Sequence, residues 1–401
     1  MDVLYKKVPF KLAIENTCSR HTVFKEERKS LTSIVGCSLR HFYIFDNILS
    51  RLELEFSDEQ KALLCLYLSN RLFVSVLSAK EVDEQFEKQN ISMKNIEKVD
   101  ELSSDKLKLI SEEYPSDSIE YLHFRYNIPT WCLKMWMKHY KGYTYKIVKT
   151  INRPLNHYAV LTNKNEDISK HPELIASKYF GLYQYNGKVS PSRHSLFKEN
   201  KAVEITPAEF YVLTKLDLDS IRKSALYCEI DNSLPSELYG MIGKNYQMDI
   251  IAGTPAAYYA SKKTIERYGL NGVNLFEANH KSIITCLSNK VHTFFVIPNN
   301  TNFAEFRNSP DYFNRVDQSL IDSYIAGQKD ALESASEFVE DGGDLVYIIP
   351  TMNKKETVQI VEDFLKAHKD YVLVEQKQFL PFDKYDSTLF FAVLRKEETN
   401  D

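Results

Sequence analysis

The stretch Ser319–His368 constrains the fold of this chain more than any other part of the sequence. Its first half has apolar residues at helical spacing, and Gly342 and Gly343 follow. We expect these glycines to end the helix, because glycine tolerates the left-handed conformation at a helix C-terminus. The apolar run Leu345–Ile349 then predicts a buried strand, which Pro350 ends because proline cannot donate to a sheet ladder. A second amphipathic helix completes the stretch. This order is typical of an α/β domain with a parallel sheet.

Strand and helix patterns alternate through the last part of the chain. The helix predicted for 255–269 has Pro255 in its first turn and Gly269 at its end. The expected strands are 224–230, 246–252, 272–278, 291–298, 345–349, 371–376 and 388–396, and the last two can form an antiparallel addition to the sheet. Ligands of such sheets bind outside the carboxyl ends of the strands. The residues around Pro350 and Thr351 should therefore lie at the site.

Length and composition limit the possible classes of protein. A chain of 401 residues is expected to form two or three domains. The formal net charge of -4 gives no overall basic field, so nucleic-acid binding would need a local patch. The start of the chain lacks a signal-peptide core and no apolar run of membrane length occurs, so we expect a soluble cytoplasmic protein without a membrane partner. The cysteines and histidines show no metal-ligand spacing, and no metal is expected.

Three domains are predicted along the chain. Residues 1–112 have helical patterns throughout, with Ser57 and Gln60 forming a capping box at the start of a central helix. The charged segment 100–118 is the best linker candidate. Residues 113–215 predict a small α+β module with a helix beginning near Pro129 and a strand at 157–161. Residues 216–401 form the α/β domain.

This order of elements resembles the NOL/NOP/Sun family of RNA cytosine-5 methyltransferases, especially the bacterial small-subunit rRNA type with a NusB-like helical domain. The segments that carry the resemblance are 33–52, 62–73, 152–164, 197–216 and, most clearly, 328–368. The resemblance implies an all-α NusB-like domain, an RNA-binding-like α+β module and a Rossmann-like class I methyltransferase domain. Its sheet would be seven-stranded and mostly parallel. The implied cofactor is S-adenosylmethionine, and the implied partner is RNA, either rRNA or a precursor.

The positions that match the family's cofactor motifs have changed. The family's glycine-rich loop is matched by the segment that begins at Glu229, where Pro235 and its neighbours would crowd a cofactor. Ala252 stands where an acidic residue should bind the ribose hydroxyls, and a methyl group accepts no hydrogen bond. Asn279 stands nearest to the aspartate that reads the adenine. We therefore expect no cofactor to bind.

The family's two cysteines are also missing. One thiolate adds to the cytosine ring and the second assists product release, but Thr301 and Pro350 stand at these positions. Thr301 lacks an obvious activating base in the sequence. Cys228 and Cys286 lie elsewhere, and neither is expected at the end of a strand.

Three hypotheses follow from these departures. The first is a degenerate, non-catalytic family member, a pseudoenzyme that binds RNA. The second is an active S-adenosylmethionine-dependent methyltransferase with a shifted site, for example one that uses Cys286 or Asp231. The third is a protein-interaction scaffold that acts through the NusB-like domain.

An RNA-binding patch is predicted between Trp131 and Arg153, where lysines alternate with aromatic residues. Lysines neutralise phosphates, and aromatic rings stack on unpaired bases. The candidate residues are Lys134, Trp136, Lys138, Lys141, Lys146, Lys149 and Arg153. The alternative is that Trp131, Met135 and Trp136 belong to the core and the lysines form an ordinary solvated face.

Overall fold

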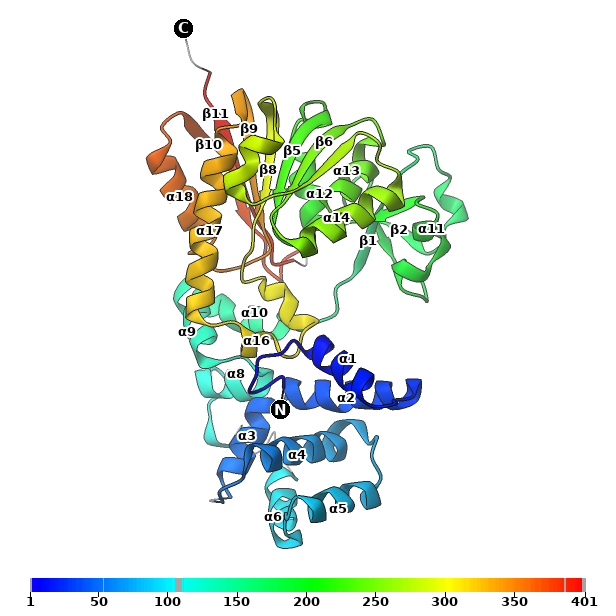
Figure 1. Ribbon diagram of the computed structural model, residues 1–401, viewed down its shortest axis with the longest axis vertical. Coiled ribbons are helices and arrows are strands. Elements are labelled where there is room, and N and C mark those ends of the chain that lie inside the picture. The colour runs from blue at the N-terminus through cyan, green and yellow to red at the C-terminus, as the bar shows by residue number, and fades with distance from the viewer. Residues whose placement is uncertain (1, 53, 105–109, 111, 386, 399–401) are drawn as a thin grey trace. The chain divides into compact units, whose positions relative to one another are not determined.

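The structure is a computed structural model that describes residues 2–52, 54–104, 110, 112–385 and 387–398 (Figure 1). Two compact units emerge from its internal contacts. The first comprises residues 1–153 and 305–317, and the second comprises 154–304 and 318–401. The predicted linker 100–118 lies partly outside the described residues. The three-domain division at 112 and 215 stays a prediction.

The first unit is helical in its described part. Its α-helices are α1 (Phe10–Arg20), α2 (Lys25–Arg40), α3 (Phe42–Ser50), α4 (Asp58–Ser69), α5 (Ala79–Lys88), α6 (Met93–Ser103), α8 (Ile119–Tyr126), α9 (Thr130–Tyr140), α10 (Thr144–Ile151) and α16 (Tyr312–Arg315). The predicted capping box is confirmed, because Ser57 Oγ accepts from Gln60 N while Gln60 Oε1 accepts from Ser57 N. Phe45 and Phe86 pack with neighbouring apolar residues in its core.

The segment 305–317 joins this helical unit although it follows a strand of the second unit in the chain. Asp311 Oδ2 accepts a hydrogen bond of 3.1 Å from the backbone N–H of Phe10. Arg307 Nε donates to the carbonyl oxygen of Ile151 at 3.1 Å. The chain therefore leaves the α/β fold after one strand and returns for the next helix.

The second unit contains a small antiparallel sheet and a large one. The small sheet has the order β2-β3-β1-β4, with β1 at His157–Leu161 as predicted. Its other strands are β2 (Leu174–Ala176), β3 (Tyr183–Tyr185) and β4 (Ala202–Glu204). The short helix α11 (Ser195–Lys198) packs on it.

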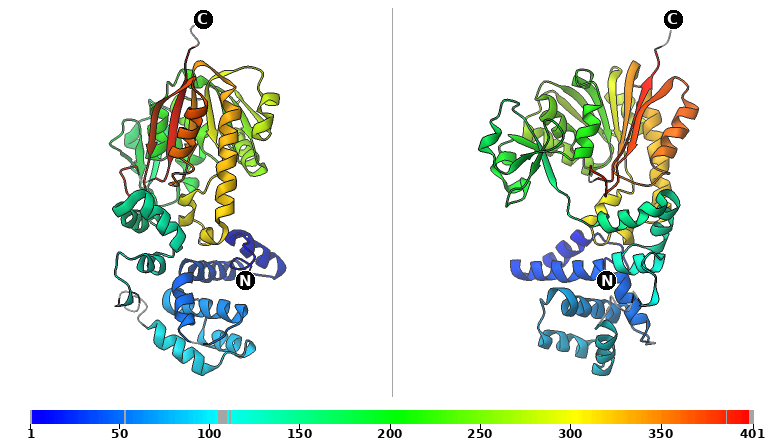
Figure 2. Two further views of the ribbon diagram at one scale, coloured as in Figure 1. Left: turned by 90° about the vertical axis from the view of Figure 1, so that its left-hand side faces the viewer. Right: turned by 180° about the vertical axis from the view of Figure 1, so that it is seen from behind.

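The large sheet has seven strands in the order β10-β11-β9-β8-β5-β6-β7 (Figures 1 and 2). The strands are β5 (Lys223–Cys228), β6 (Gln247–Ala252), β7 (Val273–Glu277), β8 (Val291–Ile297), β9 (Val339–Ile349), β10 (Tyr371–Gln378) and β11 (Phe390–Lys396). Strands β5 to β9 pair in parallel, and β11 is antiparallel to both β9 and β10. The predicted mostly parallel α/β fold with an antiparallel addition is confirmed.

Helices cover both faces of this sheet. One face carries α12 (Pro207–Thr214), α13 (Leu234–Ile242) and α14 (Pro255–Tyr268), and its core includes Leu226 and Phe295. The other face carries α15 (Ile283–Cys286), α17 (Gln318–Ser336) and α18 (Val358–Ala367), and its core includes Tyr227 and Tyr347. Strands buried on both faces read as continuous apolar runs, which explains why β9 was visible in the sequence.

The prediction that Gly342 and Gly343 end a helix is wrong. Helix α17 ends at Ser336, and both glycines lie inside β9. The register between β8 and β9 shifts here, since Val291 pairs with Val339 but Thr293 pairs with Asp344. The extra residues form a bulge, in which Gly342 adopts a φ of 76°.

We expect Gly343→Ala to lower the free energy of unfolding by about 3 kcal/mol, an overpacking cost. A β-carbon at this position would lie 2.6 Å from the carbonyl oxygen of His292 and 2.9 Å from that of Glu340, which are backbone atoms that cannot turn aside. Gly342→Ala is the matched control. A β-carbon at position 342 would make only ordinary contacts, but the backbone φ is positive there. We therefore expect Gly342→Ala to lower the free energy of unfolding by about 1 kcal/mol. Urea unfolding of both variants measures the difference, and equal costs would contradict the bulge.

Candidate functional site

The positions singled out in the sequence come together at the carboxyl edge of the large sheet. Parallel strands end at the same edge, so residues far apart in the chain become neighbours there. Ala252 ends β6, Glu229 and Asn279 closely follow β5 and β7, Thr301 and Pro350 follow β8 and β9, and Pro235 lies in the first turn of α13.

A tyrosine and a glutamate from the end of β5 lie beside the end of β6. The buried Tyr227 hydroxyl donates to Glu229 Oε1 at 2.7 Å, and the backbone N–H of Asn299 donates to Glu229 Oε2 at 2.8 Å. The Tyr227 hydroxyl also fills the space beside Gly253, where a β-carbon would lie 2.5 Å from it. Burial raises the pKa of Tyr227, so this hydroxyl stays protonated and donates. These two side chains therefore occupy the space between the ends of β5 and β6.

Sequence reasoning missed Tyr227. It read the strand as apolar, and a tyrosine inside an apolar run gives no sign that its hydroxyl ends at the edge of the sheet. The only available signal was Glu229 two residues later, since alternate residues of a strand point to the same face.

A buried network around Glu356 joins the ends of β8 and β9. Glu356 is fully buried and accepts hydrogen bonds from Thr301 N at 2.9 Å and Thr301 Oγ1 at 2.6 Å. Gln328 Nε2 at 3.1 Å and Asn353 Nδ2 at 2.9 Å donate to the same carboxylate. The hydroxyl oxygens of Thr301 and Thr351 lie 2.5 Å apart. The network ties the loops after both strands to α17.

The expectation that Thr301 has no neighbouring base is wrong. Glu356 contacts its hydroxyl directly, a partner invisible in the sequence because it lies 55 residues away. Thr301 is only 1% exposed, however, and burial raises the pKa of Glu356. The Thr301 hydroxyl is therefore shielded from solvent, and its hydrogen bonds link the loops after β8 and β9.

The two cysteines considered for a shifted site are poorly placed for catalysis. Cys228 is the last residue of β5, which corrects the expectation that it lies away from a strand end. It is fully buried, and burial raises the pKa of its thiol to about 12, so a thiolate is not available. Cys286 lines a cavity with Lys223, Gln247 and Lys290, which mark the amino ends of the strands.

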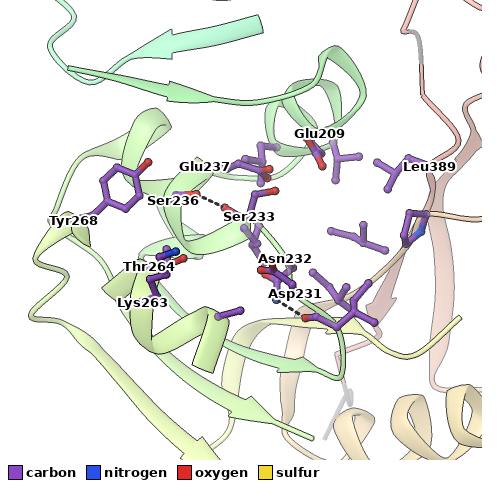
Figure 3. Close-up of a pocket in the computed structure, with 18 of the residues that line it drawn as sticks. Glu209, Asp231, Asn232, Ser233, Ser236, Glu237, Lys263, Thr264, Tyr268 and Leu389 are labelled. Carbon is purple, nitrogen blue, oxygen red and sulfur yellow. Dashed lines mark hydrogen bonds between the residues drawn. The ribbon is translucent and has the colours of Figure 1, made fainter. Parts of the chain in front are cut away.

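An open cavity of about 480 Å³ lies beside α12, α13 and α14 (Figure 3). Its lining includes Glu209, Asp231 and Glu237, and it reaches Pro350 at the end of β9. None of Glu229, Ala252 and Asn279 lines it. Its lining does include residues 230–234, 236 and 237, which belong to the segment matched to the family's glycine-rich loop. The expectation that the neighbours of Pro235 leave no room for a ligand is therefore wrong, and the cavity can accept a ligand of small-molecule size.

The predicted RNA-binding residues lie on α9, on α10 and in the turn between them, except for Arg153, which follows α10. The prediction that Trp136 contacts RNA is wrong, because this side chain is fully buried and cannot stack on a base. The other candidates, Lys134, Lys138, Lys141, Lys146, Lys149 and Arg153, are all exposed. The buried residues of the two helices face the core, so these basic residues form the opposite face, which we call the basic face.

The basic face is free of carboxylates along the chain. No Asp or Glu occurs from residue 121 to residue 165, a stretch that contains every residue of the basic face. Tyr143 is 55% exposed, and Lys146 Nζ lies 5.5 Å from the centre of its ring. An open hollow lined by Tyr140, Lys141 and Tyr143 lies beside them. An aromatic ring flanked by lysines suits a nucleic-acid strand.

Within the described ranges, the acids, histidines and cysteines form no group of three or more that could hold a metal ion. None of the helices in the described part of the chain is long and apolar enough to cross a membrane.

The fold matches solved structures of methyltransferases. The crystal structure of PH0851 is similar over 95% of this chain and 93% of its own, with a TM-score of 0.68 and 15% identity. A methyltransferase homolog protein from Pyrococcus horikoshii covers 71% of this chain and 99% of its own, with a TM-score of 0.57 and 11% identity.

NSun6 from Pyrococcus horikoshii, solved with SFG, covers 67% of this chain and 98% of its own, with a TM-score of 0.56 and 13% identity. No protein-family model and no curated protein matches the sequence. At such low identity these likenesses show the fold, and they support the resemblance drawn from the sequence.

Proposed function

We propose that this chain is a non-catalytic protein with the fold of an RNA cytosine-5 methyltransferase, and that it binds RNA, either rRNA or a precursor. The observation that carries the proposal is the buried network of Thr301, Thr351 and Glu356. It occupies the ends of β8 and β9, where methyl transfer to cytosine would need two accessible thiols.

The ends of β5 and β6 support the same proposal. A methyl donor needs space for its ribose and an acceptor for the ribose hydroxyls. Tyr227 takes up that space, both carboxylate oxygens of Glu229 already accept protein hydrogen bonds, and Ala252 offers a methyl group. A donor bound at the ends of β5 and β6 would have to break the partly buried Tyr227–Glu229 hydrogen bond, which is costly.

RNA binding is proposed for the basic face. Its lysines are exposed and have no acidic neighbours in the chain, and Tyr143 offers a ring for base stacking. NSun6 and the methyltransferase homolog share the fold. The proposal is therefore that the protein binds RNA but does not methylate it.

A methyl-transfer assay tests the catalytic part of the proposal. We expect the purified protein, tritiated S-adenosylmethionine and rRNA or tRNA to give no incorporation above that of heat-denatured protein. The reason is that neither thiol position carries a cysteine and that Cys228 is buried as the neutral thiol. Incorporation that Cys286→Ser or Asp231→Asn abolishes would instead show an active enzyme with a shifted site.

A further inference from the structure

The cavity beside α12, α13 and α14 contains a carboxyl group with an unused hydrogen-bonding atom. Glu237 lines the cavity and is 3% exposed. Its Oε1 atom has no hydrogen-bond partner among the described residues. Buried polar atoms in folded proteins nearly always have a partner, because leaving one unsatisfied is costly. A ligand that donates to this oxygen would remove that cost.

A second carboxyl group lies against the first. Glu209 of α12 faces Glu237 of α13 across one wall of the cavity (Figure 3). One oxygen of Glu209 is held in place, since Glu209 Oε2 accepts from the backbone N–H of Thr206 at 2.8 Å. Burial raises the pKa of Glu237 well above its usual range, and the charge of Glu209 raises it further. Asp231, in the loop after β5, adds a third carboxyl group to the lining.

The rest of the lining divides the cavity into two ends (Figure 3). The end near Leu389 is apolar and includes Ile297 and Ile348. The other end is formed by α14, which contributes Lys263, Thr264, Arg267 and Tyr268. The guanidinium group of Arg267 already makes a hydrogen bond within the protein, because Arg267 Nη2 donates to the carbonyl oxygen of Phe197 at 2.9 Å. The carboxyl pair therefore lies between the apolar end and the end formed by α14 (Figure 3).

We propose that this cavity binds a small organic ammonium ion, with its N–H groups donating to Glu237 and Glu209 and its apolar part against Ile297, Ile348 and Leu389. A cation between two carboxylates offsets their repulsion, and the low polarity of the surroundings strengthens the attraction. The proposal goes beyond RNA binding and does not depend on it.

Calorimetric titration of the full chain with 2-phenylethylamine tests the proposal, with 2-phenylethanol as the neutral probe of the same shape. We expect saturable binding of the amine and at least tenfold weaker binding of the alcohol. Glu237→Gln should weaken amine binding at least tenfold. Glu266→Gln removes the same charge from an exposed position of α14 outside the cavity and should leave the affinity unchanged.

Binding should also release a proton. The amine binds the ionised form of Glu237, so its affinity should increase with pH up to the pKa of Glu237 in the free protein. Titrations in two buffers with different ionisation enthalpies measure the proton. Lys263→Ala should retain or tighten amine binding, since it removes an opposing positive charge at the end formed by α14.

The stability of the Glu237→Gln variant shows whether weaker amine binding comes from loss of the carboxylate or from misfolding of the variant. The raised pKa of Glu237 stabilises the wild type below its unfolded-state pKa, and this contribution is lost as the pH rises through the folded-state pKa. The variant should therefore unfold at the same temperature as the wild type or higher at pH 8. Equal amine binding by wild type and Glu237→Gln, equal binding of amine and alcohol, or no binding at all would each overturn the proposal.

Discussion

Replacing Glu356 by alanine is expected to lower the free energy of unfolding by about 4 kcal/mol, because the change removes a buried carboxylate that accepts four hydrogen bonds. The carboxylate accepts from Thr301, Gln328 and Asn353 and is fully buried. Thr301 N and Asn353 Nδ2 would lose the acceptor provided by this carboxylate, whereas Gln328 Nε2 would keep the carbonyl oxygen of Asn299. The loss should appear in urea unfolding followed by circular dichroism.

The matched control for this change is Glu362→Ala. Glu362 is an exposed residue of α18, so its removal should change the free energy of unfolding by no more than about 0.5 kcal/mol. If Glu356→Ala also cost less than 1 kcal/mol, the network would not hold the ends of β8 and β9 together. The reason for regarding Thr301 as structural would then be lost.

Reversing three charges on the basic face is expected to weaken RNA binding by at least a hundredfold. Each lysine that contacts a phosphate releases counterions, so the slope of log affinity against log salt should become shallower by about 2 in the variant K138E/K141E/K146E. The three side chains are exposed on α9, on α10 and in the turn between them, so the fold should survive. Filter binding to rRNA at several salt concentrations measures both quantities.

The control variant is K80E/K88E/K94E. It makes the same change in net charge on α5 and α6 of the same unit, also at exposed positions. A general field effect would weaken binding in both variants, whereas a local interface weakens it only in the first. An unchanged salt slope in K138E/K141E/K146E would remove the basic face from consideration.

Local chemistry was enough to predict much of the fold. Helix α14 begins with Pro255 and ends at Gly269, whose φ is 60°, as the sequence indicated. The capping box at Ser57 and the strand β1 were also predicted correctly. These features depend on a few neighbouring residues, so the printed sequence contains what is needed to find them.

Features that depend on a distant partner were not predictable in this way. Paired glycines can end a helix or lie in a bulge of a strand, and the sequence does not show that the carbonyl oxygen of His292 in β8 comes too close to position 343 for a β-carbon. Trp136 lies among lysines in the sequence, but the packing of α9 turns it into the core. Glu356 looked like one more charged loop residue, and it became important because Thr301 and Gln328 converge on it.

We propose that the ends of β5 and β6 do not bind a methyl donor. Calorimetric titration of the full chain with S-adenosylmethionine tests it most directly, alongside a methyltransferase with an intact glycine-rich loop as a control. With Tyr227 and Glu229 hydrogen-bonded to each other at this edge, we predict no saturable heat at millimolar ligand. Micromolar binding of S-adenosylmethionine would contradict the account.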